Sequence, residues 1–192
     1  MDAIILVLTG AVIVLAIMFA KRQFMSFLAQ KPEDYSDATD VFDIRTHLNG
    51  PMICEGLVYG PTGRVSSRFV GYFNAEWNRD EGVITEHFLY NDGTTQDRTW
   101  RLKVLPDRGI DARADDVIGG GYQSGPSVQL KYRIRLPKSS GGYVLDAVDW
   151  MYLTPSGAIV NRSQFRKFGI KVAELFATIR PVAVVEKYSA AA

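Results

Sequence analysis

Apolar and polar residues alternate along most of the chain after Met52, and this two-residue period is typical of strands with one buried face. In the segment VQLKYRIRL the apolar face consists of Val128, Leu130, Tyr132, Ile134 and Leu136. Segments rich in Gly, Pro and Asn, such as PTG at 61–63 and NDG at 91–93, separate the alternating runs and predict tight turns. Eight or nine strands joined by such turns predict a mainly β fold, an antiparallel sheet that closes into a barrel and leaves no exposed edge.

The N-terminal segment has a different pattern, because residues 3–20 contain no charge and only Thr9 is polar. A helix of these 18 residues is roughly 27 Å long, close to the thickness of a bilayer core. The segment starts after an acidic residue and ends in Lys21 and Arg22 without a small-residue cleavage site, which argues against a cleaved signal peptide. We therefore predict one transmembrane helix, whose anchor residues include Ala3, Leu6, Val12, Leu15 and Phe19.

These patterns divide the chain into four predicted parts: a transmembrane helix with an interfacial extension (1–30), an acidic linker (31–41), an antiparallel β-barrel (42–181) and a C-terminal tail (182–192). Within the barrel, residues 168–180 suit either a helix or a strand. Phe168, Ile170 and Val172 alternate with polar residues or glycine, and this alternation favours the strand.

Three consecutive glycines, at 119–121, resemble a phosphate-binding loop behind the acidic pair Asp115 and Asp116. A phosphate-binding loop leads into a helix, whereas these glycines are followed by Pro126 and then by an alternating strand. The pattern therefore predicts a turn or a bulge between two strands.

The charge of the chain excludes one class of partner. Lys and Arg total 22 against 21 Asp and Glu, and Asp2, Lys21 and Arg22 account for the single net positive charge. A balanced domain gives no electrostatic reason to expect nucleic acid.

Cys54 is the only cysteine, which excludes an intramolecular disulfide, and two dispersed histidines do not suit a transition-metal site. We expect no metal and no cofactor.

Candidate catalytic residues are few. His87 follows Glu86 directly in a strand, so the two side chains face opposite sides and do not form an acid–base pair. An enzyme would require His47, His87 or Asp116 to converge in one pocket. We expect a protein without catalytic activity.

A ligand site in the barrel has better support. Arg98 and Trp100 share one strand face, and with Tyr132 and Trp150 they would line the interior. Such a lining suits an amphipathic ligand with an acidic head. The alternative is that the rings only fill the barrel and Arg98 pairs with a carboxylate, for example that of Asp149.

Several motifs, in order, resemble the bacterial family called domain of unknown function 3833: FDIRTHLNGP, EGLVYGPTGRVSSRF, FLYNDGTTQDRTWRL, ADDVIGGGYQSG, LDAVDWMYL and NRSQFRKFGIKVAEL. The resemblance spans about residues 42–175 and implies a lipocalin-like barrel without an assigned reaction. It also implies a periplasmic domain, since many members resemble lipoproteins held by an acylated Cys. This chain has no Cys directly after its apolar segment, where the lipid would be attached. The positive-inside rule, applied to Lys21, Arg22 and Lys31, instead predicts a cytoplasmic domain.

Together these features predict a single-pass protein of the bacterial inner membrane whose barrel binds an apolar or amphipathic, lipid-like molecule taken from membrane lipids. The alternative is an accessory or assembly subunit of a membrane protein complex, in which Gly10 allows another helix to approach closely. An enzyme with a His/Asp site is a third possibility.

Overall fold

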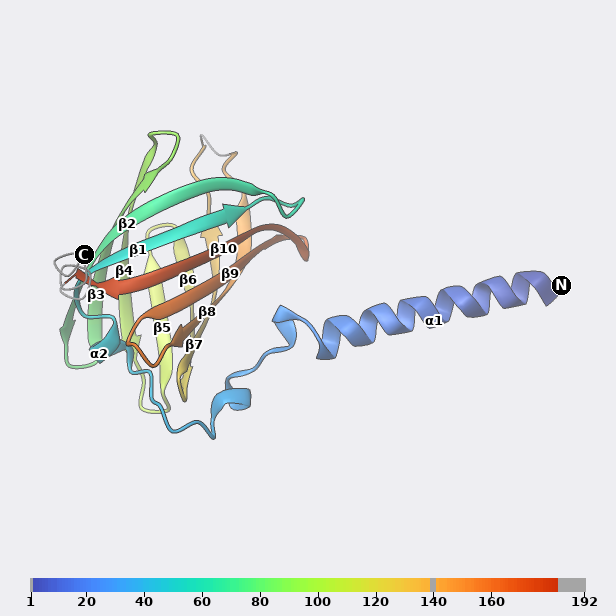
Figure 1. Cartoon of the computed structure of the whole chain (residues 1–192), viewed down its shortest axis with the longest axis horizontal. Coiled ribbons are helices and arrows are strands. Elements are labelled where there is room, and N and C mark those ends of the chain that lie inside the picture. Colours follow the sequence, from blue (N-terminus) through green and yellow to red (C-terminus); the bar gives the residue numbers. More distant parts are fainter. Residues whose placement is uncertain (1, 139–140, 183–192) are drawn as a thin grey trace.

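Ten antiparallel strands, each paired with its neighbours in sequence, form a closed barrel in the computed structural model, which describes residues 2–138 and 141–182 (Figure 1). The strands are β1 (Gly50–Tyr59), β2 (Val65–Asn78), β3 (Glu81–Tyr90), β4 (Thr95–Val104), β5 (Gly109–Ala114), β6 (Val117–Ser124), β7 (Ser127–Arg135), β8 (Val144–Leu153), β9 (Ile159–Lys167) and β10 (Ile170–Pro181). β1 closes the barrel by pairing with both β2 and β10, so that Met52 lies between Phe73 and Pro181. The mainly β prediction is confirmed, and so is the strand assignment of residues 168–180 from Ile170 onward.

The predicted number of strands, eight or nine, is wrong, and the glycines at 119–121 contribute to the difference. They lie inside β6 instead of forming a turn or a bulge between strands. Gly119 is paired with Tyr132 of β7, and Gly121 with Leu130. A Cβ atom at Gly121 would collide with the backbone carbonyl of Gln129, so the glycine is required for close approach of the two strands. The three glycines interrupt the alternation of apolar side chains in β6, which is why the sequence pattern missed this strand.

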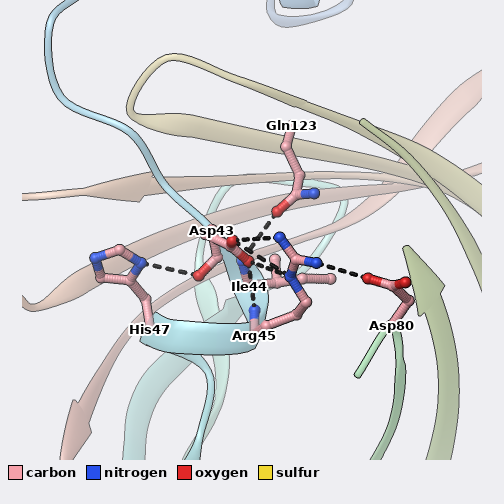
Figure 2. A network of polar contacts seen from close by, with 6 residues as sticks. All are labelled: Asp43, Ile44, Arg45, His47, Asp80 and Gln123. Carbon is pink, nitrogen blue, oxygen red and sulfur yellow. Dashed lines mark hydrogen bonds and ion pairs between the residues drawn. The ribbon is translucent and has the colours of Figure 1, made fainter. Parts of the chain in front are cut away.

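One end of the barrel is closed by α2 (Ile44–His47), and we call it the plugged end. Phe42, Ile44 and Leu48 are buried there beneath the strands. Figure 2 shows how polar contacts fix this short helix: Asp43 accepts a hydrogen bond from the backbone N–H of Arg45, and the Gln123 side chain accepts one from Ile44.

The Arg45 guanidinium adds a second link at this end, because it pairs with both Asp43 and Asp80. Asp80 lies in the turn between β2 and β3, so this ion pair joins the helix to the barrel wall. The opposite end, which carries the β9–β10 turn, is not covered by a helix within the described residues, and we call it the unplugged end.

An apolar helix, α1 (Asp2–Phe24), extends away from the barrel (Figure 1). Its segment Ala3–Phe24 has a mean hydropathy of 2.9, and the other residues that the structure describes bury none of it. By length and composition this helix is able to cross a membrane. A signal sequence near an N-terminus has the same length and composition.

The strap, residues 26–42, connects α1 to the barrel and runs along the outside of the wall formed by β6 to β9. It contains two 3₁₀ helices, η1 (Phe27–Ala29) and η2 (Pro32–Tyr35). Tyr35 packs edge-on against Trp150 at a centroid distance of 5.3 Å, and Gln30 accepts hydrogen bonds from the hydroxyls of Tyr35 and Tyr152. The segment predicted as a linker, 31–41, is therefore partly packed against the barrel. The predicted tail, 182–192, lies outside the described residues except for its first position.

Candidate functional site in the barrel interior

A cavity of about 130 Å³ lies inside the barrel. Its wall is mostly apolar and includes Phe73, Phe88, Trp100, Leu130 and Met151. Polar side chains enter it from five strands, namely Glu86 (β3), Arg98 (β4), Tyr132 (β7), Asp149 (β8), Asn161 (β9) and Ser163 (β9). A cavity of this size matches one aromatic ring and is smaller than pockets that enclose drug-sized ligands, which start at about 300 Å³.

Strand register brings the first two charged groups together. Glu86 and Arg98 are directly opposite each other in the β3–β4 pair, and both side chains point inward. The guanidinium also donates a hydrogen bond to Asp116, with an Nη2–Oδ2 distance of 3.2 Å. Asp116 lies in the turn between β5 and β6, so Arg98 connects the cavity to the unplugged end.

A second acidic group enters the cavity from the other side. Asp149 is opposite Ser163 in the β8–β9 pair, and its Oδ2 accepts a hydrogen bond of 2.9 Å from the Tyr132 hydroxyl. Tyr132 in turn packs edge-on against Trp100, with ring centroids 5.4 Å apart. Tyr132 therefore connects the acidic group to the aromatic wall.

Burial changes the proton affinity of these groups, because a charged carboxylate is poorly solvated in an apolar cavity. Burial raises the pKa of Glu86 to about 7, against the opposing charge of Arg98. Burial likewise raises the pKa of Asp149 to about 6, while the nearby hydroxyls of Ser163 and Tyr132 partly oppose the shift. Burial lowers the pKa of Arg98, but Glu86 and Asp116 outweigh it and raise the pKa overall. The interior thus holds one fixed cation and two acids that change protonation near neutral pH.

Two polar atoms of this cluster have no hydrogen-bond partner within the part of the chain that the structure describes. They are Nε of Arg98, a donor, and Oδ1 of Asp149, an acceptor. Leaving a buried polar atom unpaired costs about 1–3 kcal/mol, so such atoms in a cavity are available to a bound molecule. A group with both a donor and an acceptor, such as a hydroxyl or an amide, matches the pair.

The structure places three of the four predicted interior residues, Arg98, Trp100 and Tyr132, in the cavity wall. Trp150 is different: it is fully buried, but on the outside of the barrel, where it stacks on Tyr152 and lies under Tyr35. The prediction of an inward Trp150 is wrong because the strap covers part of the outer wall, so an outward ring is also buried. Arg98 pairs with Asp116 rather than with Asp149.

The residues considered for catalysis do not converge, and none of them lines the cavity. His87 is on the outer face, where it contacts Asp97 at 2.6 Å. His47 belongs to α2 at the plugged end, while Asp116 lies at the unplugged end. Among the described residues, no group of three or more His, Cys, Asp and Glu side chains has the arrangement of a metal site.

Sequence reasoning missed Glu86 as an interior residue and considered Asp149 only as a partner of Arg98. A signal was present for both. Glu86 has the same strand parity as Ile84 and Phe88, and Asp149 has the same parity as Ala147 and Met151. An acid on the apolar face of a strand indicates a buried ionisable group.

The comparisons with known proteins agree with this architecture. A family model described as a protein of unknown function, DUF3833, matches residues 22–181. Among solved structures, that of Rv2717c from M. tuberculosis has a TM-score of 0.52 at 14% identity and covers 71% of this chain and 93% of that one. This likeness supports the barrel fold alone.

Two further solved structures are more distant. A redesigned β-barrel, mFAP1, bound to DFHBI has a TM-score of 0.37 at 13% identity, covering 70% of this chain and 94% of that one. A Bacteroides fragilis protein with a YmcC-like fold has a TM-score of 0.34 at 12% identity, covering 67% and 94%. Their shapes differ too much to carry an argument. A search of curated proteins found no match.

Proposed function

We propose that this chain, which belongs to the DUF3833 family, is a membrane-anchored barrel that binds a small amphipathic molecule in its interior. The observation that carries the proposal is the polar cluster in an otherwise apolar cavity. A barrel with only a structural role would fill this space with apolar side chains, because burying ionisable groups costs free energy. Here Arg98 and Asp149 keep unpaired polar atoms beside the cavity.

The charge of the cluster defines the polar part of the ligand. Arg98 already faces the carboxyl groups of Glu86 and Asp116. An acidic head on the ligand would add a further negative charge beside these two groups. The sequence suggested a ligand with an acidic head, whereas these contacts favour a ligand whose head is a neutral polar group. A hydroxyl or an amide would accept from Arg98 and donate to Asp149.

The cavity volume limits the apolar part. About 130 Å³ accommodates a group of ring size, so a diacyl lipid would not fit as a whole. The proposed ligand is a small amphiphile that partitions into the membrane. The apolar helix α1 supports membrane attachment, since its apolar surface covers every side and remains exposed.

The test is mass spectrometry of organic extracts from the full-length protein, purified in mild detergent. Arg98→Met removes the cationic group from the cavity. Its matched control is Arg101→Met on the same strand, where the side chain is exposed. We expect one discrete small molecule, near one per chain, in the wild type and in Arg101→Met, and its loss in Arg98→Met. Bulk lipid alone, in equal amounts from all three proteins, would contradict the proposal.

A second candidate function is that of an accessory or assembly subunit of a membrane protein complex. The supporting observation is that the apolar segment of α1 is not buried by any other described residue, and the surroundings of Gly10 are open. A small residue on an apolar helix permits close approach of another helix. Cross-linking in intact membranes, followed by purification, would yield a defined heteromeric product if this function holds. Cross-links to lipid only would exclude it.

A further inference from the structure

We propose that the end of the β9–β10 hairpin, residues 166–171, is a second membrane-contact surface that inserts into the lipid interface beside α1. We call these residues the hairpin tip. The inference rests on the proposed function in one respect, namely that α1 spans the membrane. It adds an orientation for the barrel, because the hairpin tip belongs to the unplugged end.

The hairpin tip exposes large apolar side chains. Phe168 is 91% exposed and Ile170 is 70% exposed, although Phe and Ile are common in protein cores. The backbone of Phe168 also has a positive φ of 52°, a conformation that Gly or Asn adopts at lower cost. Neither the exposure nor the backbone favours Phe for folding. A contact outside the chain explains why an aromatic side chain is present.

Basic and aromatic residues flank the two apolar side chains. Lys167 places its Nζ 3.3 Å from the ring centre of Tyr143, and Arg166 and Lys171 are its neighbours in the hairpin. The nearby acid, Glu174, is already engaged by Arg162 and Lys171. Apolar residues at the tip with basic and tyrosine side chains around them match a bilayer interface that contains anionic headgroups.

The position of α1 supports a lipid partner over a protein partner. Arg22, in the last turn of α1, places its Nη2 4.0 Å from the point that a Cβ of Gly169 would occupy. Burial and the nearby charge of Arg22 both lower the pKa of Arg166, which reflects the same proximity. If α1 spans the bilayer, its last turn lies at the interface, and the hairpin tip lies at the same depth. Figure 1 shows β9 and β10 ending on the side from which α1 extends.

Such docking would turn the unplugged end of the barrel toward the lipid. The plugged end, with Phe42 and Ile44 buried beneath the strands, would then face away from the membrane.

The test uses the full-length protein in nanodiscs that contain phosphatidylglycerol and brominated phospholipids, which quench tryptophan on contact. Phe168→Trp reports on the hairpin tip, and Ile170→Trp is an independent second reporter. Val83→Trp, on β3 near the plugged end, is the matched control, because Val83 is also an exposed apolar residue. The signal of the native Trp77, Trp100 and Trp150 is subtracted with the wild-type protein.

We expect brominated lipid to remove most of the added fluorescence of Phe168→Trp and Ile170→Trp, and little of that of Val83→Trp. Equal, weak quenching at all three positions would overturn the proposal. Flotation of the same samples, with and without alkaline extraction, tests α1 separately. Protein that stays membrane-bound while positions 168 and 170 remain unquenched would refute the hairpin contact and leave the anchor intact. Protein released by alkali would refute the anchor and the hairpin contact together.

Discussion

At the scale of single residues, the main feature is the pair of acidic side chains inside an otherwise apolar barrel. Glu86 and Asp149 both bind protons more tightly in the folded chain than in the unfolded chain, because burial opposes their charged forms. Arg98 reduces this effect without removing it, since it also pairs with Asp116. The protonation of the interior is therefore coupled to folding.

The first prediction concerns pH. Between the ordinary pKa of Glu86, 4.5, and its folded value of about 7, the folded chain holds more protons than the unfolded chain. The free energy of unfolding should therefore fall as the pH rises through this window, and Asp149 adds a similar fall between 3.8 and about 6. Each unit of pKa shift corresponds to about 1.4 kcal/mol, so the Glu86 contribution is on the order of 3–4 kcal/mol.

Glu86→Gln should flatten this pH dependence, as measured by urea unfolding in mild detergent at several pH values. Glu81→Gln is the control, because Glu81 is on the same strand but pairs with Lys103 at the surface. An unchanged slope in Glu86→Gln would show that Glu86 is not the group responsible.

Strand parity allowed part of this site to be predicted from the sequence. The alternation around Arg98, Trp100 and Tyr132 was regular, and all three line the cavity. Parity alone did not assign Trp150, because both faces of β8 are apolar: one faces the cavity and the other faces the strap. The strap contacts join residues more than a hundred positions apart, as between Gln30 and Tyr152, and no local pattern encodes them.

At the scale of elements, the strap acts as an outer layer over one part of the barrel. Trp150 has an exposed fraction of 0% although it points outward, and Tyr35 and Tyr152 enclose its ring. Aromatic pairs of this kind contribute about 0.5–1.5 kcal/mol beyond the burial of their surface. The strap therefore stabilises the barrel as well as connecting it to α1.

The second prediction is that Tyr35→Ala loosens the strap. It should lower the free energy of unfolding by about 1–3 kcal/mol, because it removes the aromatic contact and exposes Trp150 to water. The expected readout is a red shift of tryptophan emission and faster proteolysis between residues 26 and 42. Tyr35→Phe keeps the ring and loses only the hydrogen bond to Gln30, so it should behave nearly as the wild type. Equal effects from both variants would mean that the hydroxyl matters more than the ring.

The third prediction concerns the glycines of β6. Gly121→Ala should destabilise the protein by at least about 2 kcal/mol, because the new methyl group would meet the backbone of Gln129, which cannot rotate away. Gly60→Ala is the control, since its nearest neighbouring atoms are 3.9 Å from the added carbon. The measurement is the thermal unfolding temperature of both variants, which should fall clearly in Gly121→Ala and little in Gly60→Ala. A small effect at Gly121 would indicate that β6 and β7 are less closely paired than the register implies.

At the scale of the whole molecule, the barrel class followed from strand alternation and short turns, whereas the closing contact did not. Hairpin neighbours such as β2 and β3 are joined by a short turn and are predictable from the turn residues. The pair β1–β10 joins residues at opposite ends of the domain, such as Cys54 and Ile179. The sequence implies this pair only indirectly, because an open sheet would leave two apolar edge strands in water.

The fourth prediction tests this closure by hydrogen exchange of the full-length protein, followed by mass spectrometry of peptides from β1, β10 and β3. In a closed barrel every strand has two partners, so the amides of β1 and β10 should exchange as slowly as those of β3. In an open sheet, the amides of β1 and β10 that face the missing partner would be unprotected, and about half of each strand would exchange within the shortest labelling time. Fast exchange confined to β1 and β10 would contradict the closed topology and, with it, the enclosed cavity on which ligand binding depends.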